Sequence, residues 1–205
     1  YSVIVFLVFG YSAAVQASLI NVFGDGQIIG APGSVIDDAP GAENNKQQGF
    51  DEVKGYTLGT ALGVDGGTIA AGITVDSHMI FLNTRGGRYA EGTATWTFSG
   101  EILGVMSDFS GSLEIASSGF LGAAGTVYPT SPFRARGLEN NPTDGLTNDD
   151  WYSFSGNSLD LFMRVTEPGD WVRVVTAASP VPEPGTMLLF GIGLIGLASV
   201  SRRLN

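Results

Sequence analysis

The sequence predicts an all-β protein: an antiparallel β-sandwich with a jelly-roll-like order of strands, and an apolar segment at each end of the chain. Two observations support this fold class. The 205 residues include 30 glycines but only 10 Lys and Arg, and Thr, Val, Ile, Ser and aromatic residues are common, a mixture that favours short strands over long helices. Short apolar stretches also recur about every 8–14 residues, separated by Gly, Asp, Asn and Pro. A closed barrel is the alternative arrangement.

The strands are predicted in chain order from residue 24 onward. Residues 24–52 are rich in Gly, Pro, Asp and Asn, and we expect an irregular edge segment with one or two short strands. In residues 87–100, threonines alternate with Ala94, Trp96 and Phe98, which predicts a strand with one buried face. Further strands are predicted at 56–62, 68–75, 78–83, 101–106, 111–116, 150–156, 157–165 and 170–176.

A short helical turn is the alternative over one part of this region. Residues 110–122 mix small residues with Leu113 and Leu121, a composition that also suits a helix. Trp96 and Trp171 lie on predicted strands, where tryptophan is usually a core residue.

The first segment, residues 1–17, has the pattern of a secretory signal peptide. Val3 to Phe9 is continuously apolar, and Val15 and Ala17 are small residues at the −3 and −1 positions of a cleavage site. A basic region normally precedes such a run, so we expect the start of the peptide to be truncated. A buried N-terminal strand is the alternative. The predicted β-sandwich domain then spans residues 18–178.

The last segment, residues 179–205, combines three features in order. A Pro-Glu-Pro triplet comes first, an uncharged apolar run follows, and a pair of arginines comes next. We predict a transmembrane span over residues 186–201, with the arginines as a stop-transfer signal. The run is short against a hydrocarbon core of about 30 Å, so a buried helix is the alternative.

This order of parts resembles the PEP-CTERM sorting signal, with Pro182, Glu183 and Pro184 as its motif and Arg202 and Arg203 as its basic end. The resemblance implies an exported bacterial protein that is membrane-anchored as a precursor. It implies processing by an exosortase-type protease and a final location at the cell surface or in the extracellular matrix. Proteins with this tail tend to occur in bacteria that make extracellular polysaccharide, which is therefore an expected partner.

A second resemblance concerns the domain itself. The stretch from Ile102 to Thr176, with Asp76-Ser77-His78 before an apolar strand and Pro168-Gly169-Asp170 before the last strand, is similar to an ectodomain that recurs among PEP-CTERM proteins. The resemblance implies a β architecture and carries no activity with it.

Composition excludes several classes of function. The formal net charge of −10 argues against binding to nucleic acid, because such binding depends on Lys and Arg that neutralise phosphates. The chain contains no Cys, which excludes disulfides, zinc-thiolate sites and cysteine nucleophiles. No cofactor is expected, and calcium is the one candidate ion.

The single histidine, His78, follows Asp76 and Ser77 directly. Side chains alternate between the two faces of a strand, so Asp76 and His78 share a face while Ser77 points the other way. These three residues therefore cannot form a local catalytic relay. We predict a structural or surface role for His78 at the entrance of its strand, no catalytic residue and no enzymatic activity.

The candidate ligand face lies in and after an Asn- and Asp-rich stretch. Carboxylates there have the oxygen chemistry that calcium prefers, although their spacing does not fit an EF-hand. Adjacent aromatic residues suit stacking on a sugar. A solvated turn is the alternative. Asp37, Asp38 and Glu43 form another acidic group. The predicted ligand or calcium face consists of Asp144, Asp149, Asp150, Trp151 and Tyr152.

Three functions are compatible with these observations. The first is a non-enzymatic surface or matrix protein associated with extracellular polysaccharide. The second is a carbohydrate- or calcium-dependent binding module, and the third is a hydrolase of surface polymers. The absence of a catalytic constellation in the sequence favours the first, which overlaps with the second because a matrix protein can act by binding sugar.

Overall fold

The computed structural model describes residues 18–39, 44–84, 86, 88–139 and 150–178. The predicted signal peptide (1–17) and transmembrane span (186–201) lie outside these residues and stay predictions. Within the described part of the chain, no helix is long and apolar enough to cross a membrane.

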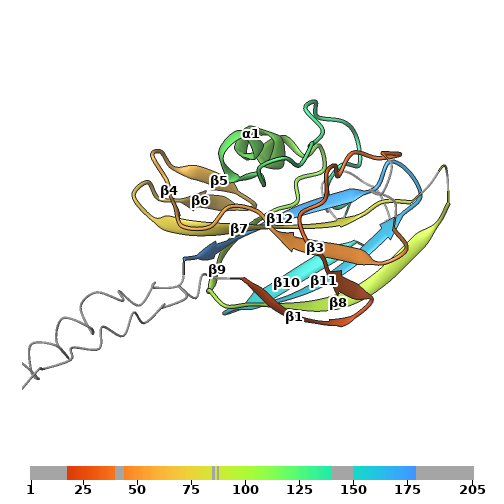
Figure 1. The fold of residues 1–205 in the computed structure, drawn as a ribbon, viewed down its shortest axis with the longest axis horizontal. Helices are drawn as coiled ribbons and strands as arrows, with labels where there is room; N and C mark the ends of the chain where they lie inside the picture. Colours follow the sequence, from red (N-terminus) through yellow and green to blue (C-terminus); the bar gives the residue numbers. More distant parts are fainter. Residues whose placement is uncertain (1–17, 40–43, 85, 87, 140–149, 179–205) are drawn as a thin grey trace, which may run out of the picture. The chain divides into compact units, whose positions relative to one another are not determined.

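Four antiparallel strands form one sheet, which we call the outer sheet (Figure 1). Its order is β1 (Leu19–Gly24), β8 (Ala90–Phe98), β11 (Ser158–Val165) and β10 (Trp151–Ser155). Burial alternates strictly along β8, as the sequence predicts, because one face packs on the core and the other faces solvent.

A second sheet, the central sheet, lies against the inner face of the outer sheet (Figure 1). Its order is β2 (Gly26–Ile28), β3 (Gln47–Asp51), β7 (Thr74–Leu82), β12 (Asp170–Ala177) and β9 (Ile102–Met106), and β4 (Tyr56–Thr57) also pairs with β7. The prediction of a purely antiparallel fold is wrong in one place, since β2 and β3 run parallel. The 24–52 region does contain two short strands, but β3 lies inside the sheet and only β2 lies at its edge.

Apolar side chains from both sheets form a common core. Trp96 is fully buried there, as predicted, and its Nε1 donates to Oε1 of the buried Gln47 at 2.9 Å. Gln47 in turn donates from Nε2 to the carbonyls of Gly92 and Leu161, so a buried amide has its hydrogen bonds satisfied while it links the two sheets. The all-β prediction is confirmed and the two facing sheets are consistent with a sandwich, whereas the jelly-roll order stays a prediction.

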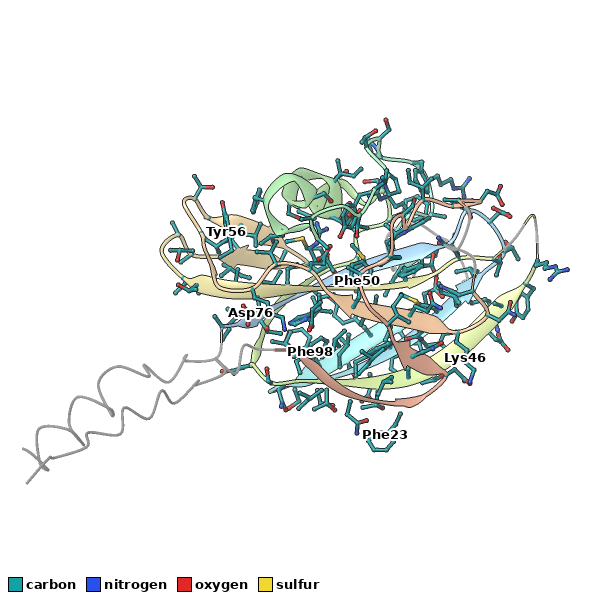
Figure 2. All side chains as sticks on the ribbon, viewed as in Figure 1. Phe23, Lys46, Phe50, Tyr56, Asp76 and Phe98 are labelled. Carbon is teal, nitrogen blue, oxygen red and sulfur yellow. The ribbon has the colours of Figure 1, made fainter. Side chains whose placement is uncertain are left out.

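The other face of the central sheet is covered as well (Figure 1). Helix α1 (Ser112–Leu121), the hairpin of β5 (Leu62–Val64) and β6 (Gly67–Ile69), and the loops before β3 and after α1 pack on it. Strands β7 and β12 are therefore buried on both faces. Trp171 lies in this second core, as predicted for a core tryptophan. Figure 2 shows Phe98 between the two sheets and Phe23 projecting away from β1.

Helix α1 corrects the predicted strand at 111–116 and confirms the helical alternative. Asp108 accepts hydrogen bonds from the backbone N–H groups of Ser112 and Leu113, at 2.8 and 2.9 Å, and so caps the first turn. Gly111 precedes the helix with φ 68°, a conformation that favours glycine, and a Cβ there would overlap the Arg136 side chain. The predicted strand at 68–75 is also wrong in its middle, where the chain turns. There the Gly72 N–H donates to the carbonyl of Leu58, and the Leu58 N–H donates to the carbonyl of Ile73.

A buried ion network holds α1 to the central sheet. Arg173 on β12 donates to both carboxylate oxygens of Glu52, at 2.7 and 2.8 Å, and to the backbone carbonyl of Glu114 on α1. The Glu114 carboxylate pairs with Arg136, which also donates to the carbonyl of Pro129. All four charged side chains are at most 2% exposed. The network contains two positive and two negative groups, so its charges balance.

Candidate functional site

A groove of about 460 Å³ opens between the β5–β6 hairpin, the loop before α1 and strand β10. The hairpin places Asp65 in its wall, the loop adds Ser107, Asp108 and Phe109, and α1 adds Leu113. Strand β10 contributes Trp151 and Tyr152. The wall therefore combines aromatic rings with carboxylates.

Tyr152 and Asp65 lie together in the groove. The Tyr152 hydroxyl donates to Oδ2 of Asp65 at 3.1 Å, and Ser107 donates to the same oxygen from its backbone N–H and its hydroxyl. Burial raises the pKa of Asp65, although these hydrogen bonds oppose the rise. Burial and the charge of Asp65 raise the pKa of Tyr152, so its hydroxyl stays a hydrogen-bond donor.

Trp151 is one of the residues that line the groove and is 39% exposed. Its ring stacks on Phe162 of β11 with a centroid distance of 6.4 Å and an interplanar angle of 17°. Phe162 in turn lies under the Arg164 guanidinium, at 5.9 Å. Because β10 is an edge strand of the outer sheet, the Trp151 ring packs on Phe162 of β11 and has no neighbouring strand on its other side among the described residues.

The structure divides the predicted ligand face. Trp151 and Tyr152 lie in the groove, whereas Asp150 is fully buried. The Asp150 carboxylate accepts the backbone N–H groups of Arg164 at 2.6 Å and Glu139 at 3.3 Å, and burial raises its pKa to about 6. Asp144 and Asp149 lie outside the described residues.

Three further groove residues, Asp65, Asp108 and Phe109, could not be found from sequence patterns. They belong to segments far from β10 in the chain, and no local pattern distinguishes them from ordinary turn and cap residues. Asp108 in particular is occupied as the cap of α1.

His78 lies between two groups that resemble the partners of a catalytic histidine. Its Nδ1 is 2.8 Å from Oδ1 of Asp51, and its Nε2 is 3.1 Å from the Thr176 hydroxyl. However, His78 and Thr176 are both fully buried, and the imidazole packs on Phe98 inside the core. Ser77 points to the opposite face and donates to Glu52, as its strand position predicts. The arrangement supports a structural role.

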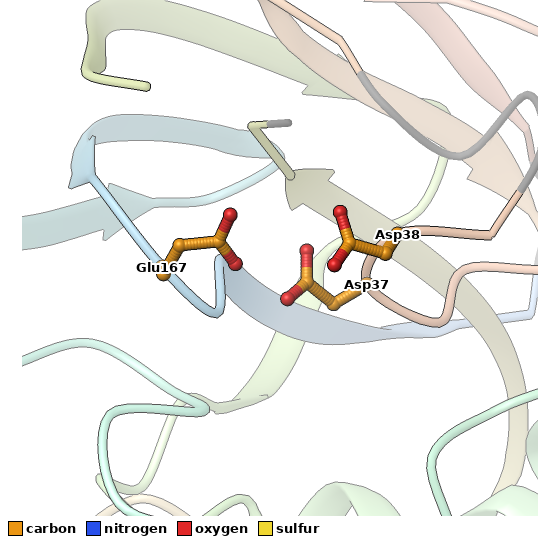
Figure 3. Close-up of side chains that lie close together, drawn as sticks. All are labelled: Asp37, Asp38 and Glu167. Carbon is orange, nitrogen blue, oxygen red and sulfur yellow. The ribbon is translucent and has the colours of Figure 1, made fainter. Parts of the chain in front are cut away.

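A group of three carboxylates lies at the end of the central sheet (Figure 3). Asp37 and Asp38 come from the loop before β3, and Glu167 comes from the turn between β11 and β12. One carboxylate oxygen from each lies within 4.8 Å of the others. Partial burial, a hydrogen bond with Glu167 and the charges of both neighbours raise the pKa of Asp37 to about 7. Glu43, which the sequence groups with these aspartates, lies outside the described residues.

Comparison with known proteins identifies the C-terminal segment. Residues 180–203 match the PEP-CTERM protein-sorting motif, a range that includes Pro182, Glu183, Pro184, Arg202 and Arg203. No curated protein and no solved structure matches the chain. The chain is therefore a PEP-CTERM-containing protein, and the motif implies export toward the cell surface and processing by an exosortase-type enzyme.

Proposed function

We propose that the described domain is a non-enzymatic surface module that associates with extracellular polysaccharide through the groove at Trp151 and Tyr152. The sorting motif brings the protein to the surface, where such polymers occur, first as a membrane-anchored precursor. The observation that carries the proposal is that aromatic residues, among them the partly exposed Trp151, and the acidic residues Asp65 and Asp108 line a single groove.

This combination suits a sugar ring. A pyranose has an apolar C–H face that can stack on Trp151, and hydroxyl groups that can donate to carboxylate oxygens such as those of Asp65. The groove volume also lies within the range of about 300–1,000 Å³ that is common for small-molecule sites.

The hydrogen bonding of the two carboxylates supports binding rather than hydrolysis. A glycosidase of the usual kind needs one protonated carboxyl group as an acid and a second carboxylate as a base or nucleophile. Asp108 accepts two backbone N–H groups and the Ser110 hydroxyl, and Asp65 accepts hydrogen bonds from Ser107 and Tyr152. Both groups are thus engaged as hydrogen-bond acceptors that hold the groove wall in place.

The test is affinity electrophoresis of the purified protein in gels that contain neutral, amino or acidic polysaccharides. We expect retardation by at least one polymer, and we expect Trp151→Ala to weaken it about tenfold because the stacking surface is lost. Phe23→Ala is the matched control, since Phe23 is 66% exposed on β1 at the opposite edge of the same sheet.

Two outcomes would contradict the proposal. Equal retardation of the wild type and Trp151→Ala would remove the groove from polysaccharide binding. Release of new reducing ends from a retained polymer would show that the module is an enzyme.

A further inference from the structure

The acidic group at the end of the central sheet is built from two loops that are far apart in the sequence. Figure 3 shows the carboxyl groups of Asp37, Asp38 and Glu167 turned toward one another, and their oxygens lie within 4.8 Å. When all three are ionised, like charges at this distance repel by about 3 kcal/mol per pair at an effective dielectric constant of about 20. A bound cation would remove that repulsion.

Both loops are anchored to the central sheet near these carboxylates. The carbonyl of Val35, two residues before Asp37, accepts hydrogen bonds from Trp171 Nε1 at 2.8 Å and Asn83 Nδ2 at 3.1 Å. The Thr84 hydroxyl donates to the carbonyl of Thr166, directly before Glu167, at 2.8 Å. The carboxylates are therefore held close together by bonds that do not involve the carboxylates themselves.

Unsatisfied polar atoms gather in the same place. In the described part of the chain, six buried side-chain nitrogen or oxygen atoms have no hydrogen-bond partner. Four of the six belong to these loops and the adjoining strand ends, although buried polar atoms normally find a partner. The four atoms are Asp37 Oδ1, Asn44 Nδ2, Asn83 Oδ1 and Asp170 Oδ2.

Asn83 is an independent indication of a ligand. It is 0% exposed, and its Oδ1 lacks a partner although its other polar groups bond to Val35 and Asn44. This oxygen lies against Gly169, at the position that a Cβ on that residue would occupy. The Asn83 amide thus has its Nδ2 bonded to the loop that carries Asp37, and its unpartnered Oδ1 lies against the turn that carries Glu167.

We propose that Asp37, Asp38 and Glu167 bind a calcium ion, with Asn83 Oδ1 as the neutral oxygen on the buried side. The ligand atoms are all oxygens, and three are carboxylates, which is the chemistry of a hard divalent cation. Calcium accepts six to eight oxygens in flexible geometry, so that water completes a site on exposed loops, whereas magnesium demands a stricter octahedron. The ion joins the loop before β3 to the turn before β12.

The experiment is isothermal titration of the metal-stripped full-length protein with calcium chloride, together with thermal unfolding in chelator and in calcium. We expect saturable binding of one calcium per chain and an increase in the unfolding temperature of a few degrees at millimolar calcium. Glu167→Gln and Asp38→Asn remove one ligand each from exposed positions, and each should weaken calcium binding at least tenfold without loss of the fold.

Glu101→Gln is the matched control, since it removes the same charge from an exposed position just before β9. Equal weakening by this control would show a general charge effect and would overturn the proposal. Absence of saturable heat at millimolar calcium would also overturn it. Unchanged binding in Glu167→Gln, with loss of binding in Asp144→Asn, would place the ion in the 140–149 segment and not at this cluster.

Discussion

Two charged regions on the central sheet differ in how their charges are balanced. Beneath α1, Glu52 and Glu114 are buried beside Arg173 and Arg136, and every carboxylate has a guanidinium partner. At the end of the sheet, the charged neighbours that shift the pKa of Asp37 most are Asp38 and Glu167, both of the same sign. The balanced network has its partners within the fold and serves structure, whereas the unbalanced cluster favours a ligand from outside.

The balance has a physical origin in desolvation. Taking a charge out of water costs several kcal/mol, which a buried pair recovers only with good geometry and further hydrogen bonds. Arg173 meets this requirement through its bidentate pair with Glu52 and its contacts with the carbonyl of Glu114 and the Ser117 hydroxyl. Burial alone would lower the pKa of Arg173, but Glu52 and Glu114 raise it, so the charge persists.

Breaking the balanced network should have the largest effect. Arg173→Met leaves Glu52 buried without its counter-charge, and we expect a loss of about 3–5 kcal/mol in the free energy of unfolding. Urea denaturation followed by circular dichroism measures it. Arg88→Met, at an exposed position, should change stability by less than about 0.5 kcal/mol.

A double variant sharpens this prediction. Glu52→Leu together with Arg173→Met removes both charges, so the pair should recover much of the loss of the single variant. Additive losses from the two changes would mean that packing, and not charge pairing, explains the role of Arg173.

The second prediction concerns Asp51, a carboxylate whose hydrogen bonds outweigh its burial. Burial would raise its pKa, but hydrogen bonds from His78, Ser18, the Leu19 N–H and Lys54 hold the pKa well below its usual range. The resulting stability is present above about pH 4 and is lost as the pH falls below that value. Asp51→Asn should therefore cost about 2 kcal/mol at pH 7 and progressively less below pH 4. Equal costs at pH 7 and pH 3 would contradict the prediction.

The third and smallest effect concerns Asp150, where burial raises the pKa more than the hydrogen bonds from the backbone lower it. Its pKa rises to about 6 in the folded protein, so its contribution to stability is complete below about pH 4 and is lost as the pH rises through 6. We expect Asp150→Asn to gain about 1–2 kcal/mol relative to the wild type between pH 4 and pH 7. Denaturation curves of both proteins at matched pH values give the change of this difference in the free energy of unfolding with pH. A pH dependence of the same sign as for Asp51 would contradict the prediction.

Much of the fold could be predicted because it follows from local periodicity. Ala94, Trp96 and Phe98 alternate with exposed or half-buried threonines on β8, and the structure buries all three. Prediction failed where a helix cap and a contact from a distant strand, Arg173 with the carbonyl of Glu114, favour a helix instead. Residues 111–116 read as a strand, yet Asp108 caps a helix there.

The candidate sites depend on contacts that are less visible in the sequence. Trp151 and Tyr152 stood out as adjacent aromatic residues, but Asp65 reaches Tyr152 only because the β5–β6 hairpin packs beside β10. Asp150 has the composition of a surface ligand and proves to be buried. The burial of a single polar residue depends on which distant segments pack over it, and the local sequence pattern does not contain this information.

By itself, the sequence determined the all-β class and the burial of one face of β8. It also determined the C-terminal sorting motif, which is a linear signal that needs no fold to be recognised. Only the tertiary structure decided that His78 lies between Asp51 and Thr176, and that Glu167 joins Asp37 and Asp38. The reason is physical: alternation along a strand is a property of neighbouring residues, whereas these groupings depend on the pairing of strands and the anchoring of loops that are distant in the chain.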